Sequence, residues 1–504
     1  MNTATQSKLT QSKLSQSKPT QSKPPQSKAT VYNHAIVIGG SIAGLTTARV
    51  LTDHFARVTV IERDSPTDAT EFRKGAPQAR HPHALLARGQ QILEQQFPGL
   101  VTELVAAGAV PMDMGRDFAF FVDGGWCQPY DSHIMSTACS RPLLENTIYQ
   151  RLVAHPKVTF MHEQEVMGLY VDPKKTRVTG VQIRARGIPD ATIREIPADL
   201  VIDASGRDSH APQWLASLGY TPPAETMVNA FPGYATRVFK RPANAPAAWK
   251  TLYIMAMAPN HSRGAVIMPM EGDRWMVCLV GMAGDYPPTD EAGFWAFMRS
   301  LPSSRIYDAV KDAEPLTAPY GYRRAENRMR YYENLPRYLD GFLVSGDAVY
   351  AFNPVYGQGM TVAAMASLTL DECLTRQRQQ HGEQTLAGLA KQFQTKLAGV
   401  IAGPWQMATG QDVLWPVCEG GKQPDGITKV INGYMDRVIR TMPYNTVVAD
   451  AFFHVQNMLK PPTSLFHPKV LWNVLKPGAR SQQTQPAAHP IQVVESQVSP
   501  MAGD

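Results

Sequence analysis

The stretch that decides the fold is "HAIVIGGSIAGLTTARVL", residues His34–Leu51, in which an apolar run meets closely spaced glycines. Its first part, Ala35–Ile38, has the composition of a buried strand, and Gly39–Gly40 then predicts a tight turn. A second strand, "VTVIERD", follows and reaches Glu62. Strand, turn, helix and strand in this order predict the βαβ unit of a dinucleotide-binding fold. The helix between the strands is expected to carry four apolar side chains on one side: Leu45, Ala48, Leu51 and Phe55.

Five residues of this unit are candidates for nucleotide binding. Gly39 permits the tight turn, and Gly44 allows the helix and the strand to pack closely. The free N–H groups at the helix start favour a pyrophosphate. Glu62, with Arg63 beside it, stands roughly 20 residues after Gly39, where a carboxylate can accept both ribose hydroxyls of an adenosine. The middle glycine of the G-x-G-x-x-G pattern is replaced by Ser41, which is small and can donate a hydrogen bond. The alternative is a βαβ unit that binds no nucleotide.

A second stretch, "GFLVSGDAVYAFNPVYGQGM" (Gly341–Met360), indicates which nucleotide is bound. Asp347 follows a strand, and its carboxylate can bind a ribityl hydroxyl. Gly357 and Gly359 present backbone N–H groups where a helix begins, and that end of a helix favours negative charge. A reduced isoalloxazine ring carries its negative charge along one edge, so this arrangement suits a flavin. The alternative is an ordinary glycine turn between a strand and a helix.

With these motifs, the chain resembles FAD-dependent monooxygenases of the p-hydroxybenzoate-hydroxylase fold. Within that fold it looks most like bacterial flavin epoxidases that act on polyketide polyenes. The resemblance covers about residues 35–370 and rests on segments that include "VIGGSIAGL", "VIERD", "RKGAPQARHPHALL", "ACSRPLLENTI", "VIDASGRDS", "IMPMEGDRWMV" and "GDAVYAFNPVYGQGM". It implies an α/β (α+β composite) fold: a Rossmann-type FAD-binding domain, an interleaved and mainly antiparallel β-sheet substrate domain, and a helical C-terminal region.

The expected domain boundaries follow from this resemblance and from composition. A QSK-repeat head and a tail rich in Gln, Pro and Ser are polar, and both are expected to be disordered. The divisions are the head at 1–30, the FAD-binding domain at 31–110, 136–217 and 320–395, the substrate-binding domain at 111–135 and 218–319, the helical region at 396–477, and the tail at 478–504.

The resemblance also implies roles for individual residues. Ser41 and Gly44 would contact the FAD pyrophosphate, Glu62 the adenosine ribose, and Asp347 the ribityl and pyrophosphate end. Arg141, in "SRPLL", would reach the phosphates or the ribityl chain, with a surface salt bridge as the alternative. The segment Arg73–Leu86 would run over the flavin and its entry channel, with His83 either near the flavin or purely structural. The residues expected beside the flavin ring are Pro354, Gly357 and Gly359.

One departure from the family pattern concerns the segment "ASGRDSHAP", Ala204–Pro212. Many aromatic hydroxylases of this fold have an Asp-Gly motif here that serves FAD and NAD(P)H and ends in arginine. In this chain Ser205 replaces the aspartate and Pro212 the arginine, and Asp203 is a candidate to take over part of the role. The "DASG" form also resembles flavin halogenases and geranylgeranyl-type reductases. The way in which a nicotinamide nucleotide is used is therefore left open.

The implied reaction is a monooxygenation with NADPH or NADH as electron donor and O2 as co-substrate. One oxygen atom would pass from a flavin C4a-hydroperoxide to a lipophilic compound of secondary metabolism, by alkene epoxidation or aromatic hydroxylation. An alkene needs no deprotonation, so an apolar pocket suffices and no catalytic acid or base is assigned. An FAD-dependent reductase that saturates isoprenoid double bonds is the alternative; a non-catalytic flavoprotein is less favoured, and a halogenase is disfavoured because no W-x-W-x-I-P segment occurs. The candidate pocket residues, each of which also suits a core, are Phe118, Phe120, Trp126, Met268, Met270 and Trp275.

Composition limits the partners. The net charge of +6 arises largely from five lysines in the head, so no nucleic-acid partner is expected. The five cysteines are widely spaced, which favours a reducing, cytoplasmic compartment and no metal site. The helical C-terminal region is rich in Met, Trp and Phe, and a cap over the substrate channel is its favoured role. A peripheral contact with a membrane, a dimer interface and a separate reductase partner are the alternatives that remain.

Overall fold

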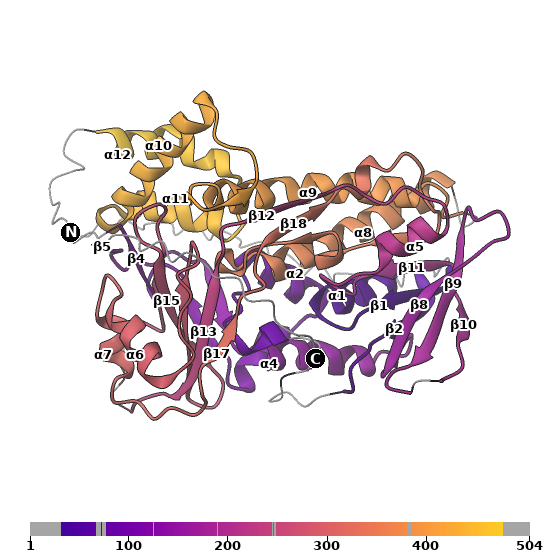
Figure 1. Cartoon of the computed structure of the whole chain (residues 1–504), viewed down its shortest axis with the longest axis horizontal. Helices are drawn as coiled ribbons and strands as arrows, with labels where there is room; N and C mark the ends of the chain where they lie inside the picture. The colour runs from indigo at the N-terminus through magenta and orange to yellow at the C-terminus, as the bar shows by residue number, and fades with distance from the viewer. Residues whose placement is uncertain are drawn as a thin grey trace, which may run out of the picture.

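The computed structural model describes residues 32–66, 72, 77–123, 125–188, 190–243, 245, 248–381 and 385–476. The head and tail that are expected to be disordered lie outside these residues. The described part is a mixed α/β structure with a parallel sheet towards one end and a larger, mainly antiparallel sheet towards the other (Figure 1). Within the described residues, no helix combines the length and the apolar character needed to cross a membrane.

The parallel sheet has five strands in the order β19-β11-β1-β2-β7. Its central strand is fully buried from Ala35 to Val37, as expected for a parallel sheet that is covered on both faces. The helices α1 and α8 pack on each other beside this sheet and share its core. The elements of this part are β1 (Tyr32–Ile38), α1 (Ile42–Leu51), β2 (Phe55–Ile61), α2 (Ala87–Gln96), α3 (Leu100–Ala106), α4 (Arg141–Val153), β7 (Val158–Met161), β11 (Leu200–Asp203), α5 (Ala211–Ser217), β19 (Phe342–Val344), α8 (Gly359–His381) and α9 (Leu389–Asp412).

The predicted βαβ unit is present, but one residue of it was placed wrongly. Phe55 was expected on the helix, whereas it begins β2. The helix ends at Leu51, and the chain then closes a tight last turn. In this turn the Asp53 N–H donates to the Val50 carbonyl oxygen and the His54 N–H donates to the Leu51 carbonyl oxygen, each three residues back. Phe55 is still fully buried. Phe55 stands four residues after Leu51, which is also the spacing of one face of a helix. The spacing of apolar residues alone therefore does not show where α1 ends and β2 begins.

The larger sheet has seven strands in the order β17-β13-β16-β15-β14-β4-β5, antiparallel except between β14 and β4. Side chains of a strand alternate between the two faces, and along β16 Trp275, Val277 and Leu279 face the core shared with α6 and α7. Cys278 and Val280 belong to a different core cluster. The elements are β4 (Phe118–Val122), β5 (Gly125–Trp126), β13 (Gly233–Lys240), β14 (Thr251–Ile254), β15 (Arg263–Met270), β16 (Arg274–Gly281), α6 (Glu291–Arg299), α7 (Arg305–Val310) and β17 (Tyr320–Tyr322).

Smaller sheets complete the structure. A three-stranded sheet in the order β10-β9-β8 contacts β2 and β11 of the parallel sheet, and a four-stranded sheet in the order β20-β18-β12-β21 lies next to α9. The strands of these sheets are β3 (Val110–Asp113), β6 (Met135–Ala138), β8 (Gln164–Val171), β9 (Val178–Ala185), β10 (Arg194–Pro197), β12 (Glu225–Asn229), β18 (Asn327–Arg330), β20 (Tyr350–Ala351) and β21 (Glu419–Gly420).

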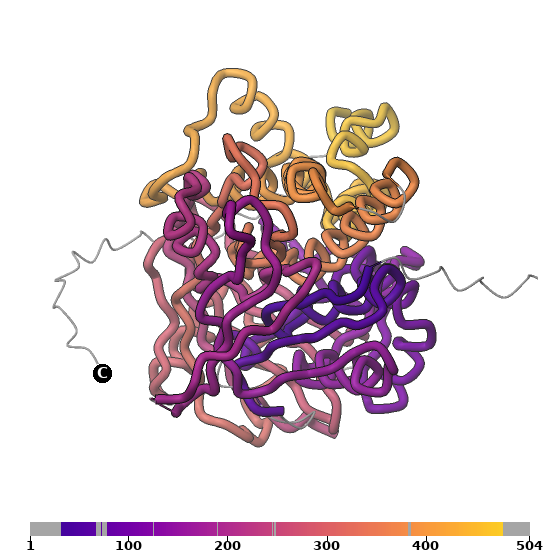
Figure 2. Tube along the Cα trace, turned by 90° about the vertical axis from the view of Figure 1, so that its right-hand side faces the viewer, coloured from indigo at the N-terminus to yellow at the C-terminus, as the bar shows by residue number. Residues whose placement is uncertain are grey.

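The predicted helical C-terminal region is confirmed. It consists of α10 (Gly426–Thr441), α11 (Thr446–Gln456) and α12 (Pro468–Leu475), with the short 3-10 helix η6 (Pro462–Phe466) before α12. Two views at right angles show these helices along the same side of the molecule as α9 (Figures 1 and 2). The region packs on the seven-stranded sheet, because Phe453 of α11 lies against Phe118 and Phe120 of β4.

Candidate functional site

A cavity of about 760 Å³ lies between the two large sheets and is lined by segments from most of the chain. This volume falls within the range of roughly 300–1,000 Å³ that is typical of small-molecule sites. All the predicted cofactor-binding residues except Gly44 line it: Gly39, Ser41, Glu62, Arg63, Arg141, Asp347, Pro354, Gly357 and Gly359. Segments that are about 300 residues apart in the sequence therefore meet in one cavity.

Gly39 and Gly44 shape the turn at one end of this cavity. Gly39 has a φ of 102°, and a Cβ atom added to it would come within 2.6 Å of the Ala204 carbonyl oxygen. A Cβ atom on Gly44 would lie 1.8 Å from the Gly39 carbonyl oxygen. Only glycine fits at either position. Gly44 does not line the cavity, so the structure places it behind the turn, where it supports Gly39 rather than facing a ligand.

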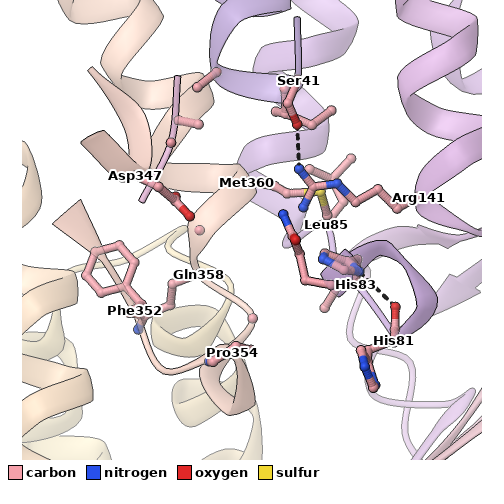
Figure 3. Close-up of a pocket in the computed structure, with 18 of the residues that line it drawn as sticks. Ser41, His81, His83, Leu85, Arg141, Asp347, Phe352, Pro354, Gln358 and Met360 are labelled. Atoms are coloured by element: carbon pink, nitrogen blue, oxygen red, sulfur yellow. Dashed lines mark hydrogen bonds between the residues drawn. The ribbon is translucent and has the colours of Figure 1, made fainter. Parts of the chain in front are cut away.

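Ser41 and Arg141 are held together at the start of α1. The Arg141 guanidinium donates from Nη2 to the Ser41 hydroxyl at 2.7 Å, and Figure 3 shows this pair on one wall. The Ser41 hydroxyl donates to Glu145 Oε1 at 2.5 Å, and Arg141 also pairs with Glu145 at 3.0 Å. The Arg141 side chain is only 12% exposed, so its ion pair lies in the cavity wall rather than on the surface. A fixed guanidinium beside a helix N-terminus suits a phosphate.

Glu145 was not found by sequence reasoning. It stands four residues after Arg141 on α4, and its Oε1 also accepts the Ile42 N–H of α1 at 3.3 Å. The i, i+4 spacing from Arg141 was the available signal, but it is common on exposed helices and does not identify a site.

Glu62 is buried at the end of β2, and its carboxylate is oriented by two backbone groups. Oε2 accepts the Gly40 N–H at 2.7 Å, and Oε1 accepts the Asp64 N–H at 3.0 Å. Arg63 follows it and also lines the cavity. The carboxylate is thus fixed beside the glycine turn, at the place where the pattern predicts ribose binding.

Asp347 lies on the opposite wall, in the 3-10 helix η3 (Gly346–Ala348) after β19. Figure 3 shows it facing the cavity across from Arg141. Burial raises the pKa of its carboxyl group, and the charges of Arg207, Arg141 and Arg328 oppose that rise. A carboxyl group that lines the cavity, with guanidinium groups nearby, is suited to bind the hydroxyl groups between the phosphates and the ring.

The loop before α8 carries the residues expected beside the flavin ring. Pro354 begins the 3-10 helix η4 (Pro354–Tyr356), Gly357 adopts a positive φ of 64°, and Gly359 begins α8. Gln358 is 3% exposed and lines the cavity, and its Oε1 has no hydrogen-bond partner among the described residues. A flavin ring has both N–H and carbonyl groups at its edge and would satisfy such an orphaned acceptor. The unpartnered Gln358 oxygen, the glycine turn and the helix N-termini together fit the ring and the phosphates of FAD.

A buried polar network behind this loop was not predicted. Asp412, at the end of α9, is fully buried and accepts hydrogen bonds from Asn327 Nδ2 at 2.5 Å and from Asn353 Nδ2 at 3.1 Å. Tyr356, which lines the cavity, donates its hydroxyl hydrogen to Asp412 at 2.6 Å. Tyr234 of β13 donates to Asn353 Oδ1 at 2.8 Å. The loop is therefore attached at once to α9, β18 and the seven-stranded sheet.

Two histidines line the cavity between its two halves. His81 Nδ1 lies 2.7 Å from the Thr236 hydroxyl, and His83 Nδ1 lies 2.8 Å from the His81 carbonyl oxygen (Figure 3). Burial, together with Arg80, lowers the pKa of His81 to about 4. Burial, together with Arg141, lowers the pKa of His83 to about 3. Both rings are therefore neutral at neutral pH. Residues 73–76 of the segment expected over the flavin lie outside the described residues.

Asp203, the candidate to take over part of the role of the Asp-Gly motif, lies behind the cavity wall. Its side chain is fully buried, and it does not line the cavity. One carboxylate oxygen accepts the Ser205 N–H at 2.9 Å and the other accepts the Ser209 hydroxyl at 2.6 Å. Asp203 thus braces the turn after β11. The residues of this segment that line the cavity are Ala204, Ser205, Gly206, Arg207, Asp208 and His210.

The other half of the cavity is formed by the seven-stranded sheet. Of the candidate pocket residues, Phe118 and Met268 line it. Phe120 shares their face but is covered by Phe452 and Phe453 of α11. The remaining candidates belong to core clusters, namely Trp126 and Trp275 beside α6 and α7, and Met270 against Val238 and Met276. Sequence reasoning missed other residues of this half: Met112, Met114, Tyr253, Val266, Cys278, Val280, and Gln456 with Asn457 at the end of α11.

Comparisons with known proteins identify the family of this chain. The sequence matches the family described as "FAD binding domain" over residues 32–388. It is 35% identical to Protein Rv3254 of Mycobacterium tuberculosis (strain ATCC 25618 / H37Rv) over 350 residues, 66% of this chain and 71% of that protein. It is 27% identical to kynurenine 3-monooxygenase of Salinispora tropica over 348 residues, 68% of this chain and 72% of that protein.

Among solved structures, the flavin-dependent brominase Bmp2 is similar with a TM-score of 0.57 and 16% identity, over 84% of this chain and 97% of that chain. At this identity the likeness shows a shared fold and does not carry the brominase activity over to this chain. The family match spans the parallel sheet, the glycine turn and the loop before α8. The chain therefore belongs to the FAD binding domain family and is an FAD-dependent monooxygenase.

Proposed function

We propose that the enzyme inserts one oxygen atom from O2 into an uncharged, lipophilic small molecule. Epoxidation of an alkene is the favoured reaction, hydroxylation of an electron-rich ring is the second, and NADPH or NADH is the electron donor. FAD, when bound, supplies the redox chemistry and the activation of O2. Ser41, Glu62, Arg63, Arg141 and Asp347 would hold its nucleotide and ribityl parts. The loop from Pro354 to Gly359 would hold its ring.

The observation that carries this proposal is the distribution of charge around the cavity. The charged lining residues gather in the nucleotide half: Glu62, Arg63, Asp64, Arg141, Glu165, Arg207, Asp208 and Asp347. The seven-stranded sheet contributes only uncharged side chains, among them Phe118, Tyr253, Val266 and Met268. A charged substrate would lose its hydration there without gaining an ion pair, at a cost of several kcal/mol. An apolar substrate is favoured instead.

Two histidines and two tyrosines that line the cavity favour an alkene over a phenol as the substrate. Removing the proton of a phenol needs a base whose pKa is near the working pH. His81 and His83 are weak bases, because burial lowers their pKa values to about 4 and 3. The hydroxyl groups of Tyr356 and Tyr234 already donate to Asp412 and Asn353. Oxygen transfer to an alkene requires no such base, so the walls need only orient the alkene and exclude water.

The test is a reaction with candidate alkenes and phenols of low polarity. Purified enzyme is reduced with NADPH under argon and mixed with O2, and the products are followed by mass. A gain of one oxygen atom by an alkene supports the proposal. A gain of two hydrogen atoms without O2 would overturn it in favour of the reductase alternative. Oxygen gain by phenols alone would overturn the preference for epoxidation. The Asp347→Ala variant is the control for turnover that does not depend on bound flavin.

A further inference from the structure

The apolar face of α10 continues beyond the body of the protein. Near the end of the helix this face is buried, with Val438 fully buried and Ile439 nearly so. In the first two turns the same face is open, and Ile427 and Val430 are 75% and 74% exposed. Ile431 is exposed as well. Positions 427, 430, 431, 434 and 438 follow helical spacing, so one continuous stripe leaves the core and enters solvent.

A second exposed apolar surface lies on α12. Val470 and Val474 are buried against the C-terminal region, whereas Trp472 and Leu475 are 70% and 52% exposed. Lys469 stands three residues before Trp472 and Lys476 four residues after it, so both lysines lie on the side of the tryptophan. Trp, Leu and Lys on one exposed face are typical of helices that lie in a membrane interface.

The two surfaces meet through one aromatic pair. Tyr434 of α10 stacks on Phe466 of η6 with ring centroids 4.9 Å apart, and its hydroxyl donates to the Leu465 carbonyl oxygen at 2.6 Å. Phe466 is itself partly exposed at 39%. The exposed residues form what we call the C-terminal apolar surface, and its members are Ile427, Val430, Ile431, Phe466, Trp472 and Leu475.

Charge near this surface favours an anionic partner. From Ala451 to Lys476 the chain has no Asp or Glu, while it has Lys460, Lys469 and Lys476. Asp425 and Asp436 are the acidic residues of α10 and its cap, and Asp425 is engaged by the Thr428 N–H. Basic side chains next to a lipid surface contribute about 1 kcal/mol each through attraction to anionic headgroups.

The same helical region also forms part of the cavity wall. Gln456 and Asn457, at the end of α11, line the cavity, and the Asn457 side chain accepts the Ala87 N–H at 3.0 Å. In turn α12 and η6 pack on α11. The helices that carry the exposed apolar residues are thus in direct contact with those that enclose the cavity.

From these observations we propose that the C-terminal apolar surface docks on an anionic lipid bilayer. Ile427, Val430, Trp472 and Leu475 enter the interface, and Lys469 and Lys476 contact lipid headgroups. Docking would allow the enzyme to collect an apolar substrate from the bilayer, and this use of the surface rests on the proposed function. Docking itself needs no turnover, so failure of the docking and failure of the proposed function are distinguishable.

The test is co-sedimentation of the full chain with vesicles. One set contains phosphatidylcholine alone, and the other contains phosphatidylcholine with phosphatidylglycerol as the minor component. We expect binding to the anionic vesicles, with a partition coefficient that falls roughly tenfold or more in Val430→Glu and in Trp472→Glu. Lys469→Gln and Lys476→Gln should each lower it roughly fivefold, and added salt should weaken binding.

Ile193→Glu is the matched control. Ile193 is 53% exposed and precedes β10, at the opposite end of the molecule in Figure 1, so its substitution should leave vesicle binding unchanged. The lysine-rich head is kept in every variant. Unchanged binding of Val430→Glu and Trp472→Glu would assign docking to another part of the chain and overturn the proposal. Self-association through this surface, with no binding to either type of vesicle, would overturn it as well.

Discussion

Tyr356 donates a hydrogen bond of 2.6 Å to the buried carboxyl group of Asp412, which joins the loop beside the cavity to the end of α9. Asn327 and Asn353 donate to the same carboxyl group. Asp412 lies in the part of the chain predicted as the helical region, 396–477, yet it supports a loop that belongs to the site. The position of that loop therefore depends on a residue about 55 positions further along the chain.

Replacing Asp412 by alanine should destabilise the protein and weaken FAD binding. The substitution removes one acceptor each from the Asn327 amide, the Asn353 amide and the Tyr356 hydroxyl. The Asn327 amide keeps the Val228 carbonyl oxygen as an acceptor, and each group left unsatisfied costs about 1–3 kcal/mol. We expect the free energy of unfolding to fall by about 3 kcal/mol, as measured by urea denaturation. Tyr356→Phe removes one donor only and should cost about 1 kcal/mol. Equal stability of Asp412→Ala and the parent would contradict a supporting role for this network.

Asp347→Ala should give a protein that is colourless or weakly flavinated. The substitution removes the carboxylate that is predicted to bind the ribityl hydroxyl groups, and it removes one negative charge near Arg207 and Arg141. Flavin absorbance relative to protein absorbance is the measurement. Asp347→Asn keeps the shape and a hydrogen-bonding group, so it should retain more FAD than the alanine variant. Full retention of FAD by Asp347→Ala would remove this residue from the site.

Arg141→Ala should lower FAD affinity roughly a hundredfold, because a charge-assisted hydrogen bond from arginine to phosphate is worth about 1.5–3 kcal/mol. The affinity is measured by titration of the apoprotein with FAD. Arg151 of the same helix pairs with Glu103 on the surface, so Arg151→Ala is the control and should leave FAD affinity unchanged. The same affinity in Arg141→Ala as in Arg151→Ala would reduce Arg141 to a structural ion pair with Glu145.

The nucleotide half of the site could be predicted because its residues belong to short local patterns. Gly39, Ser41 and Glu62 lie within one βαβ unit, and Asp347 and Gly359 lie within one strand-to-helix turn. The Asp412 network could not be predicted, because Asn327, Asn353 and Asp412 belong to no common pattern and meet only after folding. The residues of a sheet face that line the cavity could be predicted only in part.

Phe118 and Phe120 illustrate the last point. They share one face of β4, as alternation predicts, but only Phe118 reaches the cavity because α11 covers Phe120. Alternation along the strand predicts which face of the sheet a side chain lies on. Whether a helix covers that side chain depends on the packing of α11, which lies more than 300 residues further along the chain.

Because Phe118 lines the cavity and Phe120 is covered, substitution of Phe118 should affect substrate binding, whereas substitution of Phe120 should affect stability. Phe118→Ala should raise the KM for an apolar substrate roughly tenfold, because it removes apolar contact from the wall. Phe120→Ala should instead lower the free energy of unfolding by about 3–5 kcal/mol, the usual cost of a large cavity in a core. Steady-state kinetics and denaturation of both variants provide the comparison. A KM change of the same size in both would contradict the assignment of Phe118 to the substrate wall.

The buried histidines predict a loss of stability in weak acid. His81 is 8% exposed, and its pKa is about 4 in the folded protein against an ordinary value of 6.5. Between these values the unfolded chain binds a proton that the folded protein does not, so acid favours unfolding. The contribution of His81 to stability is fully present above pH 6.5 and is lost as the pH falls towards 4, at up to about 1.4 kcal/mol per pH unit.

The measurement is the free energy of unfolding of the parent and of His81→Gln at several pH values between 7 and 4. Glutamine can still bond to the Thr236 hydroxyl, so the variant removes the titration while keeping a polar contact. We expect the stability of His81→Gln to fall less steeply with acid than that of the parent. His155, which is more exposed and has its pKa lowered by burial and by Arg49, is the comparison, and His155→Gln should change the slope less. Parallel curves for the parent and His81→Gln would show that His81 accepts a proton as readily in the folded cavity as in the unfolded chain.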